Sequence, residues 1–213
     1  MKLRHRGPTV KTYSINDIFY SIQGEGPRSG TAVTFVRFSG CNLHCRVATN
    51  GFDCDTNTGS FELLTAAQLL AKAKAVAPRA RPRWAVFTGG EPLLQLDEQV
   101  LRAFRGSGFL VAIETNGTVK VKDDIAKYIN WLTVSPKTAD EGVHQRVANE
   151  VRVVLAKGMQ IPKTGVRAEY RVVSPAFDGQ ELNEENVKWC VQKVKENPDW
   201  ILSIQLHKIL KIP

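Results

Sequence analysis

The sequence has little cysteine: four residues among 213, too few for a scaffold built on disulfides. It has no run of eighteen apolar residues, so it predicts no membrane-spanning helix. The basic start, MKLRHRGPTVKTYS, is not followed by the apolar segment that a secretory signal needs. We therefore expect a cytoplasmic protein with reduced thiols and no membrane association.

Acidic residues are the minority charge, because 29 Lys and Arg outnumber 21 Asp and Glu and give a net charge of +8. A basic protein can bind nucleic acid. Here the basic residues are scattered, and the densest group, at 78–83, falls between a predicted helix and a predicted strand. We therefore expect a solvated loop there and no nucleic-acid partner. With no linker or repeat in view, residues 1–213 are predicted to form a single domain.

Apolar segments rich in β-branched residues alternate with amphipathic segments along the chain. This alternation predicts a parallel sheet whose helices form the crossovers. The predicted strands are 31–38, 83–90, 109–117, 131–137, 150–156, 168–175 and 200–206. The predicted helices are 64–77, 96–108, 123–128 and 183–197, with Thr65 as an N-cap. The tail after residue 206 is predicted to be too short for another helix.

Polar motifs stand where these strands end: Thr88–Pro92, Glu114–Gly117, Ser135–Lys137 and Gln205–His207. In parallel sheets, binding sites form at the carboxyl ends of strands. Each motif alone fits an ordinary turn. Their agreement predicts that four strands line one site.

Three of the four cysteines, Cys41, Cys45 and Cys54, lie within fourteen residues. Such clustering predicts a metal centre. Zinc is one possibility, with His44 as a fourth ligand. An iron–sulfur cluster with one open iron is the other. Cys190 lies on the apolar stripe of its predicted helix, which is typical of a core residue.

A three-cysteine loop after one strand and a Gly-Gly-Glu-Pro turn after the next resemble the radical S-adenosylmethionine superfamily. This resemblance implies a 4Fe–4S cluster whose open iron binds S-adenosylmethionine. The usual spacing is C-x3-C-x2-C, whereas here Cys45 and Cys54 enclose eight residues, 46–53. Asp53, with Phe52 before it, stands where the family usually has an apolar residue that packs on adenine.

Further motifs resemble the 7-carboxy-7-deazaguanine synthase family within that superfamily. They are SIQGEGP and RFSGCN, then CDT, TGGEP, ETNG and SPK, and finally QLHKILKIP, in order along nearly the whole chain. The resemblance implies an α/β fold of the partial, modified (β/α) TIM-like barrel type. It implies a lyase of queuosine-type 7-deazapurine biosynthesis. The reaction would contract 6-carboxy-5,6,7,8-tetrahydropterin to 7-carboxy-7-deazaguanine with loss of ammonia.

The resemblance also implies roles for individual residues. Thr56 would hold Mg2+ beside the substrate carboxylate, although without the resemblance a turn-capping role is favoured. The cofactor S-adenosylmethionine would bind Gly90, Glu91, Ser135, Pro136, Lys137 and Asp178. The pterin would bind Ile22, Gln23, Gly24, Glu25, Arg37, Thr88, His207 and Pro213.

Partners and rival functions complete the expectations. The resemblance implies a homodimer and a reducing partner such as flavodoxin. A glycyl-radical-enzyme activase would share the cluster but would not need the SIQGEGP loop. A non-enzymatic metal-binding module would not need ligand-like residues at four strand ends.

Overall fold

The computed structural model describes residues 10–50, 54, 60–79 and 81–213. The strands form one sheet in the order β3-β1-β2-β4-β5-β6-β7-β8-β9. From β2 to β9 all neighbouring pairs are parallel, whereas β1 is antiparallel to both β2 and β3. The strands are β1 Thr12–Ile22, β2 Ala32–Phe38, β3 Glu62–Thr65, β4 Arg83–Gly89, β5 Phe109–Thr115, β6 Trp131–Val134, β7 Val147–Leu155, β8 Arg167–Pro175 and β9 Ile201–Leu202.

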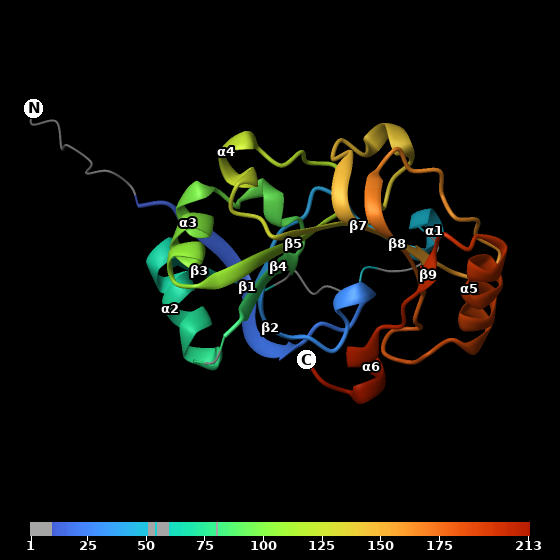
Figure 1. The fold of residues 1–213 in the computed structure, drawn as a ribbon, viewed down its shortest axis with the longest axis horizontal. Helices are drawn as coiled ribbons and strands as arrows, with labels where there is room; N and C mark the ends of the chain where they lie inside the picture. The colour runs from blue at the N-terminus through green and yellow to red at the C-terminus, as the bar shows by residue number, and fades with distance from the viewer. Residues whose placement is uncertain (1–9, 51–53, 55–59, 80) are drawn as a thin grey trace, which may run out of the picture.

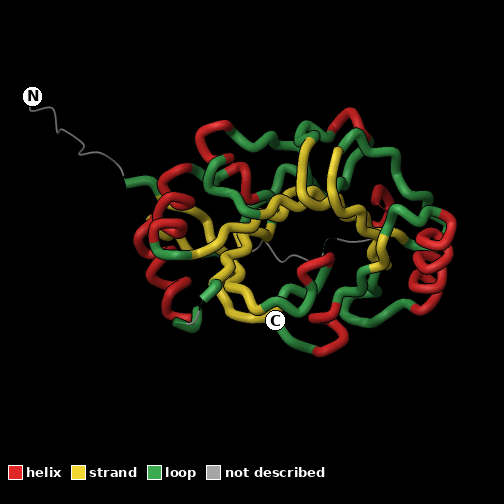
Figure 2. The backbone as a smooth tube through the Cα atoms, in the orientation of Figure 1, coloured by secondary structure: helices red, strands yellow, loops and turns green. Residues whose placement is uncertain are grey.

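The helices lie mainly outside the curved sheet. They are α1 Val47–Asn50, α2 Ala66–Val76, α3 Glu98–Gly106, α4 Asp123–Ala126, α5 Glu184–Glu196 and α6 Leu206–Leu210, with 3-10 turns at Gly26–Arg28, Pro92–Leu94 and Asp140–Gly142. Figure 1 shows α2 and α3 against one part of the sheet and α5 against the other. In Figure 2 the strands curve into an incomplete ring, and the C-terminal segment lies at its open side. This confirms the expected partial barrel.

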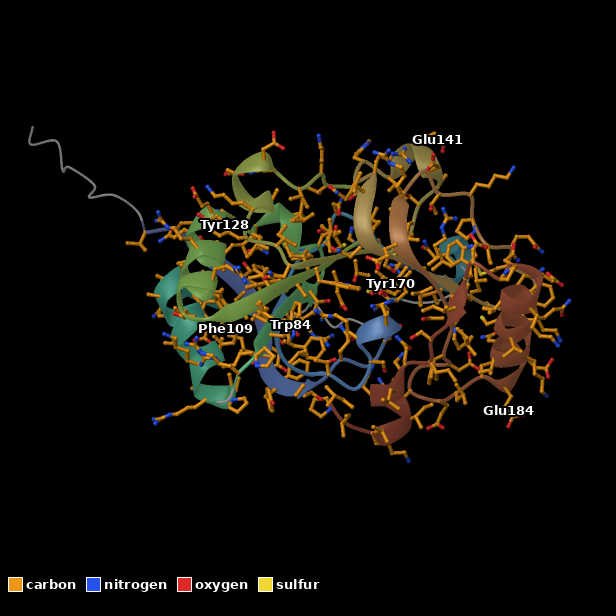
Figure 3. The ribbon with its side chains drawn as sticks, in the orientation of Figure 1. Trp84, Phe109, Tyr128, Glu141, Tyr170 and Glu184 are labelled. Atoms are coloured by element: carbon orange, nitrogen blue, oxygen red, sulfur yellow. The ribbon has the colours of Figure 1, made fainter. Side chains whose placement is uncertain are left out.

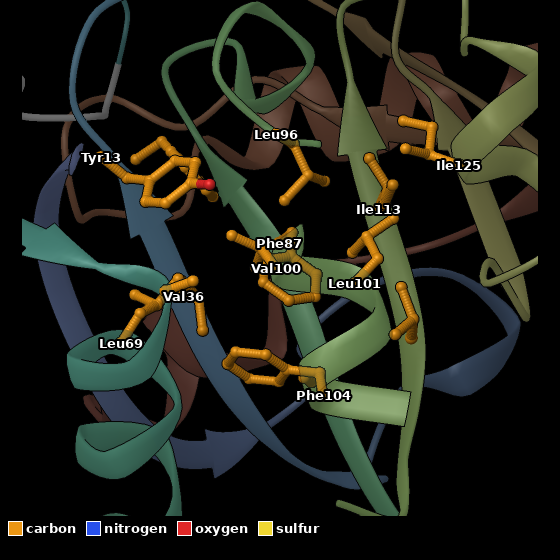
Figure 4. Packing of buried hydrophobic residues seen from close by; sticks show 14 of the residues in the cluster. Tyr13, Val36, Leu69, Phe87, Leu96, Val100, Leu101, Phe104, Ile113 and Ile125 are labelled. Atoms are coloured by element: carbon orange, nitrogen blue, oxygen red, sulfur yellow. The ribbon is translucent and has the colours of Figure 1, made fainter. Parts of the chain in front are cut away.

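The main core lies between the outer face of the sheet and α2 and α3 (Figure 4). Phe87 of β4 contacts Phe104 of α3 edge to face, with ring centroids 5.0 Å apart. A smaller apolar cluster covers the inner face, where Phe35, Val86 and Ala112 are buried. Because side chains alternate along a strand, the remaining inner positions are free to carry polar groups.

The antiparallel strands β1 and β3 were not predicted, so the expectation of an entirely parallel sheet is wrong at this edge. In β1 the sequence TYSINDIFYSI mixes polar and apolar residues, and its burial is uneven along the strand. The helix predicted over 64–77 begins only at Ala66, since 62–65 pair with β1. Thr65 is confirmed as the N-cap, because its side chain accepts from the Gln68 amide in a capping box.

The C-terminal prediction also needs correction. The strand expected over 200–206 is only Ile201–Leu202, and residues 206–210 form the helix α6, which we did not expect. The helix ends at Leu210, and its C-cap, Lys211, takes a left-handed backbone conformation with φ 54°. Among the described residues, none of the helices is both long and apolar enough to cross a bilayer.

Candidate active site

A row of polar residues crosses the inner face near the carboxyl ends of the strands. Arg37 of β2 pairs in register with Thr88 of β4, and the Thr88 hydroxyl donates to Glu114 of β5 at 3.0 Å. Glu114 pairs with Thr133, which pairs with Glu150 of β7. Figure 3 labels Trp84 of β4 and Tyr170 of β8, and Tyr170 continues this row because it pairs in register with Glu150. The parallel register therefore gathers residues far apart in sequence.

Arg152 connects three carboxylates on this face. Its Nε donates to Glu150 at 2.7 Å, and its Nη1 donates to Glu25 at 2.9 Å and lies 3.6 Å from Glu114. Burial acts to lower the pKa of Arg152, but the three glutamates together raise it above its ordinary value. Burial also acts to raise the pKa of Glu114, yet Arg152, Gln23 and Thr88 hold that pKa below its ordinary value.

The SIQGEGP loop closes over this row. The Gln23 side chain donates to Glu114 at 2.9 Å, and the Gly26 amide donates to the Ser203 hydroxyl at 2.8 Å. A Cβ on Gly24 would lie 2.1 Å from Nδ1 of His207, so only glycine fits beside that imidazole. The loop thus brings Ile22–Glu25 and His207 to the same inner site as Thr88.

The C-terminal tail docks against the same loop. The Leu206 amide donates to the Gly24 carbonyl at 2.9 Å, and the Ile212 amide donates to the His207 carbonyl at 3.1 Å. The Ser21 hydroxyl donates to a Pro213 oxygen at 2.8 Å. The tail is therefore held against the end of β1 and the SIQGEGP loop.

The cysteine loop follows β2 and is tied to the neighbouring strand ends. The side-chain amide of Asn42 donates to the Thr118 hydroxyl at 2.8 Å, and that of Asn116 donates to the Asn42 side-chain oxygen at 3.2 Å. The side-chain amide of Asn50 donates to the Lys137 carbonyl at 2.8 Å. These bonds hold the loop at the same edge of the sheet as the ETNG and SPK turns.

The thiols lie close enough to influence one another. Burial raises the pKa of Cys45; Lys137 acts to lower it, while Cys54 and Cys41 raise it further. Within the described ranges, no three His, Cys, Asp or Glu side chains are spaced to hold a single metal ion. A cubane cluster places each thiolate on a different iron, so its ligands lie farther apart. The donor set, three cysteines on one loop, fits such a cluster.

The TGGEP turn packs against the cysteine loop. A Cβ on Gly90 would lie 1.9 Å from the Gly40 carbonyl oxygen, and the Glu91 amide donates to that carbonyl at 2.9 Å. Glu91 is buried and accepts from the Leu93 and Asn116 amides and from the Thr115 hydroxyl. Burial raises the pKa of Glu91, and these hydrogen bonds oppose the rise. Its carboxylate therefore joins two turns, and the expected binding of S-adenosylmethionine at Glu91 stays a prediction.

Comparison with known proteins agrees with this geometry. Residues 35–157 match the model of the radical SAM superfamily. The chain belongs to that superfamily. It is 36% identical to the 7-carboxy-7-deazaguanine synthase of Burkholderia multivorans, over 95% of this chain and all of that protein, and 37% identical to that of Nitratidesulfovibrio vulgaris over the same shares. It therefore belongs to the 7-carboxy-7-deazaguanine synthase family.

A solved structure supports the fold. The crystal structure of QueE from Escherichia coli superimposes with a TM-score of 0.65 at 21% identity, covering 92% of this chain and 95% of that one. Membership of the superfamily implies a 4Fe–4S cluster and S-adenosylmethionine as cofactors of a radical S-adenosylmethionine lyase.

The other predicted residues occupy different surroundings. Ser135 and Lys137 lie beside the cysteine loop, and Lys137 donates to the Ser135 hydroxyl at 2.6 Å. Pro136 between them is buried. Asp178 lies in an exposed turn after β8, where it accepts from the Asn183 side chain. Thr56, Asp53 and Phe52 lie outside the described residues.

Sequence reasoning missed Glu150 and Arg152, and it quoted Glu114 only as part of a turn. The available signal was the strand EVRVVLA, in which two charged residues, two apart, share the inner face with nothing apolar between them on that face. Buried charges in a strand interior need partners, so their presence indicates a polar interior.

Proposed function

We propose that the protein converts 6-carboxy-5,6,7,8-tetrahydropterin to 7-carboxy-7-deazaguanine and ammonia, a step of queuosine-type 7-deazapurine biosynthesis. The observation that carries this proposal is the SIQGEGP loop, which bonds to the inner row through Gln23 and is covered by the C-terminal tail at Gly24. A glycyl-radical-enzyme activase would need no such loop, and the relatives that match over their whole length favour the synthase.

The inner row is suited to hold the pterin. When bound, the cluster and S-adenosylmethionine supply the radical that takes a hydrogen from C6 of the substrate. The guanidinium carbon of Arg37 lies 5.6 Å from the ring centroid of Phe19. Because this guanidinium forms no ion pair with the described residues, it is available to a substrate carboxylate. We assign Thr88, Glu25, His207 and the backbone of Ile22–Gly24 to the ring edges. The docked loop and tail would exclude water from the reacting carbon.

The cofactor side of the site lies at the cysteine loop. We propose that Cys41, Cys45 and Cys54 hold the cluster. The Gly90 backbone and the turn at Ser135–Lys137 would hold S-adenosylmethionine, with Asp178 at its adenosine. Glu91 would act there through the turn that it braces.

The remaining expectations extend this proposal. We propose that 1–213 is one domain, that the protein works as a homodimer, and that a reductant such as flavodoxin reduces the cluster in the cytoplasm. The net charge of +8 favours an acidic protein as the electron donor.

Reduced, cluster-reconstituted protein should convert the carboxypterin in the presence of S-adenosylmethionine. Liquid chromatography with mass spectrometry should detect 7-carboxy-7-deazaguanine and an equal amount of ammonia. S-adenosylmethionine should be regenerated in each turnover, so its amount should not fall in proportion to the product formed. Cleavage of S-adenosylmethionine with no change in the pterin would refute the proposal.

A further prediction concerns Mg2+, which we place beside the substrate carboxylate on Thr56. Thr56→Ala should reduce the stimulation of turnover by Mg2+, because one of the few protein oxygen ligands is lost. Cleavage of S-adenosylmethionine should persist. Titrating Mg2+ against turnover for wild type and variant tests this, and identical titration curves would remove Thr56 from the metal site.

The docked tail makes another prediction. Ser21 holds one oxygen of Pro213, which leaves the other carboxylate oxygen to accept from pterin N–H groups. Deleting Ile212-Pro213 should weaken pterin binding by about 1.5–3 kcal/mol, the value of a charged hydrogen bond. Cluster content and S-adenosylmethionine binding should stay intact. A C-terminal tag should weaken pterin binding in the same way, and an N-terminal tag is its matched control. Equal pterin affinity of the two tagged forms would exclude the carboxylate as a ligand.

A further inference from the structure

Three carboxylates from three elements meet at one guanidinium inside the ring of strands. Glu25 comes from the SIQGEGP loop, Glu114 from β5 and Glu150 from β7, and all three surround Arg152. The side chains of Arg152 and Glu150 are buried, with 5% and 2% of their surface exposed. The side chains of Glu25 and Glu114 are 15% and 20% exposed. The cluster therefore has a closed part, Arg152–Glu150, and an open part made of two carboxylates.

Both open carboxylates are held at each of their oxygens. Arg152 binds one oxygen of Glu25, and the Ser174 hydroxyl donates to the other at 3.3 Å. Gln23 donates to one oxygen of Glu114 at 2.9 Å, and Thr88 donates to the other at 3.0 Å. Each carboxylate oxygen can accept a second hydrogen bond. Both groups are thus fixed in orientation and keep accepting capacity.

The charge of the cluster is not balanced. Arg28 is the second cation, and its guanidinium carbon lies 4.2 Å from the ring centroid of Trp84 and 5.4 Å from that of Trp131. The buried Nη1 of Arg28 has no hydrogen-bond partner among the described atoms. Three carboxylates against Arg28 and Arg152 leave one excess negative charge in a largely desolvated place. Such a place favours a ligand that donates hydrogen bonds to the carboxylates, and one acceptor on that ligand would satisfy the unpaired Nη1 of Arg28.

We propose that Arg152 is a positioning residue, which presents Glu25 and Glu114 as a pair of fixed anionic acceptors and thereby selects a ligand edge rich in amino and ring N–H donors. The 2-amino-4-oxopyrimidine ring of a pterin is such an edge. This inference rests on the proposed function and deepens it, by naming the chemistry that discriminates the substrate ring from analogues with fewer donors.

The test must separate positioning from folding, because Arg152→Met alone would leave Glu150 buried without its partner. The double variant Arg152→Met/Glu150→Gln removes both charges of the buried ion pair together. Arg171→Met is the matched control, since Arg171 lies on the adjacent strand β8 and its ion pair with Asp199 is exposed. Thermal unfolding, iron content and affinity for S-adenosylmethionine report whether each variant is folded and loaded.

Calorimetry on the unreduced holoenzyme with S-adenosylmethionine measures pterin binding without turnover. We expect the double variant to raise the Kd of the carboxypterin on the order of 30-fold, as for loss of oriented charged hydrogen bonds. Its affinity for S-adenosylmethionine should change less than about twofold, and Arg171→Met should leave both affinities unchanged. The wild type should reject the 2-desamino analogue by about 100-fold or more, and the double variant should lose most of that discrimination.

A double-mutant cycle adds the decisive comparison. If Arg152 acts through Glu114, Glu114→Gln should cost far less in the double variant than in the wild type. A folded, loaded double variant with unchanged pterin Kd and unchanged discrimination would overturn the inference. Wild-type protein that binds the pterin without converting it would overturn the proposed reaction alone. Wild-type protein that does not bind the pterin would overturn both.

Discussion

Replacing Cys45 with alanine should abolish the 4Fe–4S cluster and all turnover, because each of the three loop thiolates would hold a different iron. Cys41→Ala and Cys54→Ala should have the same effect. Iron and sulfide analysis, together with EPR of the reduced protein, measures the loss directly.

Cys190→Ala is the matched control for these variants. Cys190 is buried between α5 and the sheet, and burial raises its thiol pKa to about 12, which keeps it protonated and unreactive. The substitution should retain cluster and turnover and lower the free energy of unfolding by about 1 kcal/mol, for the small volume lost. If Cys190→Ala loses the cluster while one loop variant keeps it, the ligand assignment is wrong.

Gly90→Ala should nearly eliminate the binding of S-adenosylmethionine. Its Cβ would be placed 1.9 Å from the Gly40 carbonyl oxygen, which is backbone and cannot move aside as a side chain can. The TGGEP turn and the cysteine loop would have to separate, and strain of this kind costs about 1–3 kcal/mol or more. Equilibrium binding of S-adenosylmethionine and thermal unfolding together measure the effect.

Gly106→Ala provides the comparison, because Gly106 ends α3 and a Cβ there meets no atom within 4 Å. That variant should be neutral or more stable by about 0.5–1 kcal/mol. Equal affinity of the two alanine variants for S-adenosylmethionine would show that the close contact at Gly90 is dispensable.

The sequence predicted those parts of the fold that depend on local patterns. The helix of Cys190 follows from periodicity, and Thr65 follows from capping chemistry. The strand predicted over 83–90 follows from an apolar run before a double glycine, and the structure has it as Arg83–Gly89. β1 escaped prediction because its partners β2 and β3 are what stabilise it, and its own residues mix polar and apolar character. α6 escaped because five residues are too few to show a helical period.

The parts of the site that lie in a contiguous motif were predictable from the sequence. The parts that depend on how the strands pair were not. The cysteine loop and the SIQGEGP loop are contiguous in sequence, so their chemistry can be recognised. Arg152 and Glu25 are 127 residues apart, and only the register of β7 against its neighbours brings them together. The hydrogen bonds of Glu91 to Thr115 and Asn116 could not be predicted either, because they depend on the packing of two turns.

The hydrogen bond between Ser21 and Pro213 joins residues 192 positions apart. During synthesis, Ser21 and Gly24 emerge from the ribosome long before their partners in 203–213 exist. The site can therefore reach its final form only after the segment 203–213 has left the ribosome. A nascent chain can have a folded sheet while its substrate loop is still uncovered.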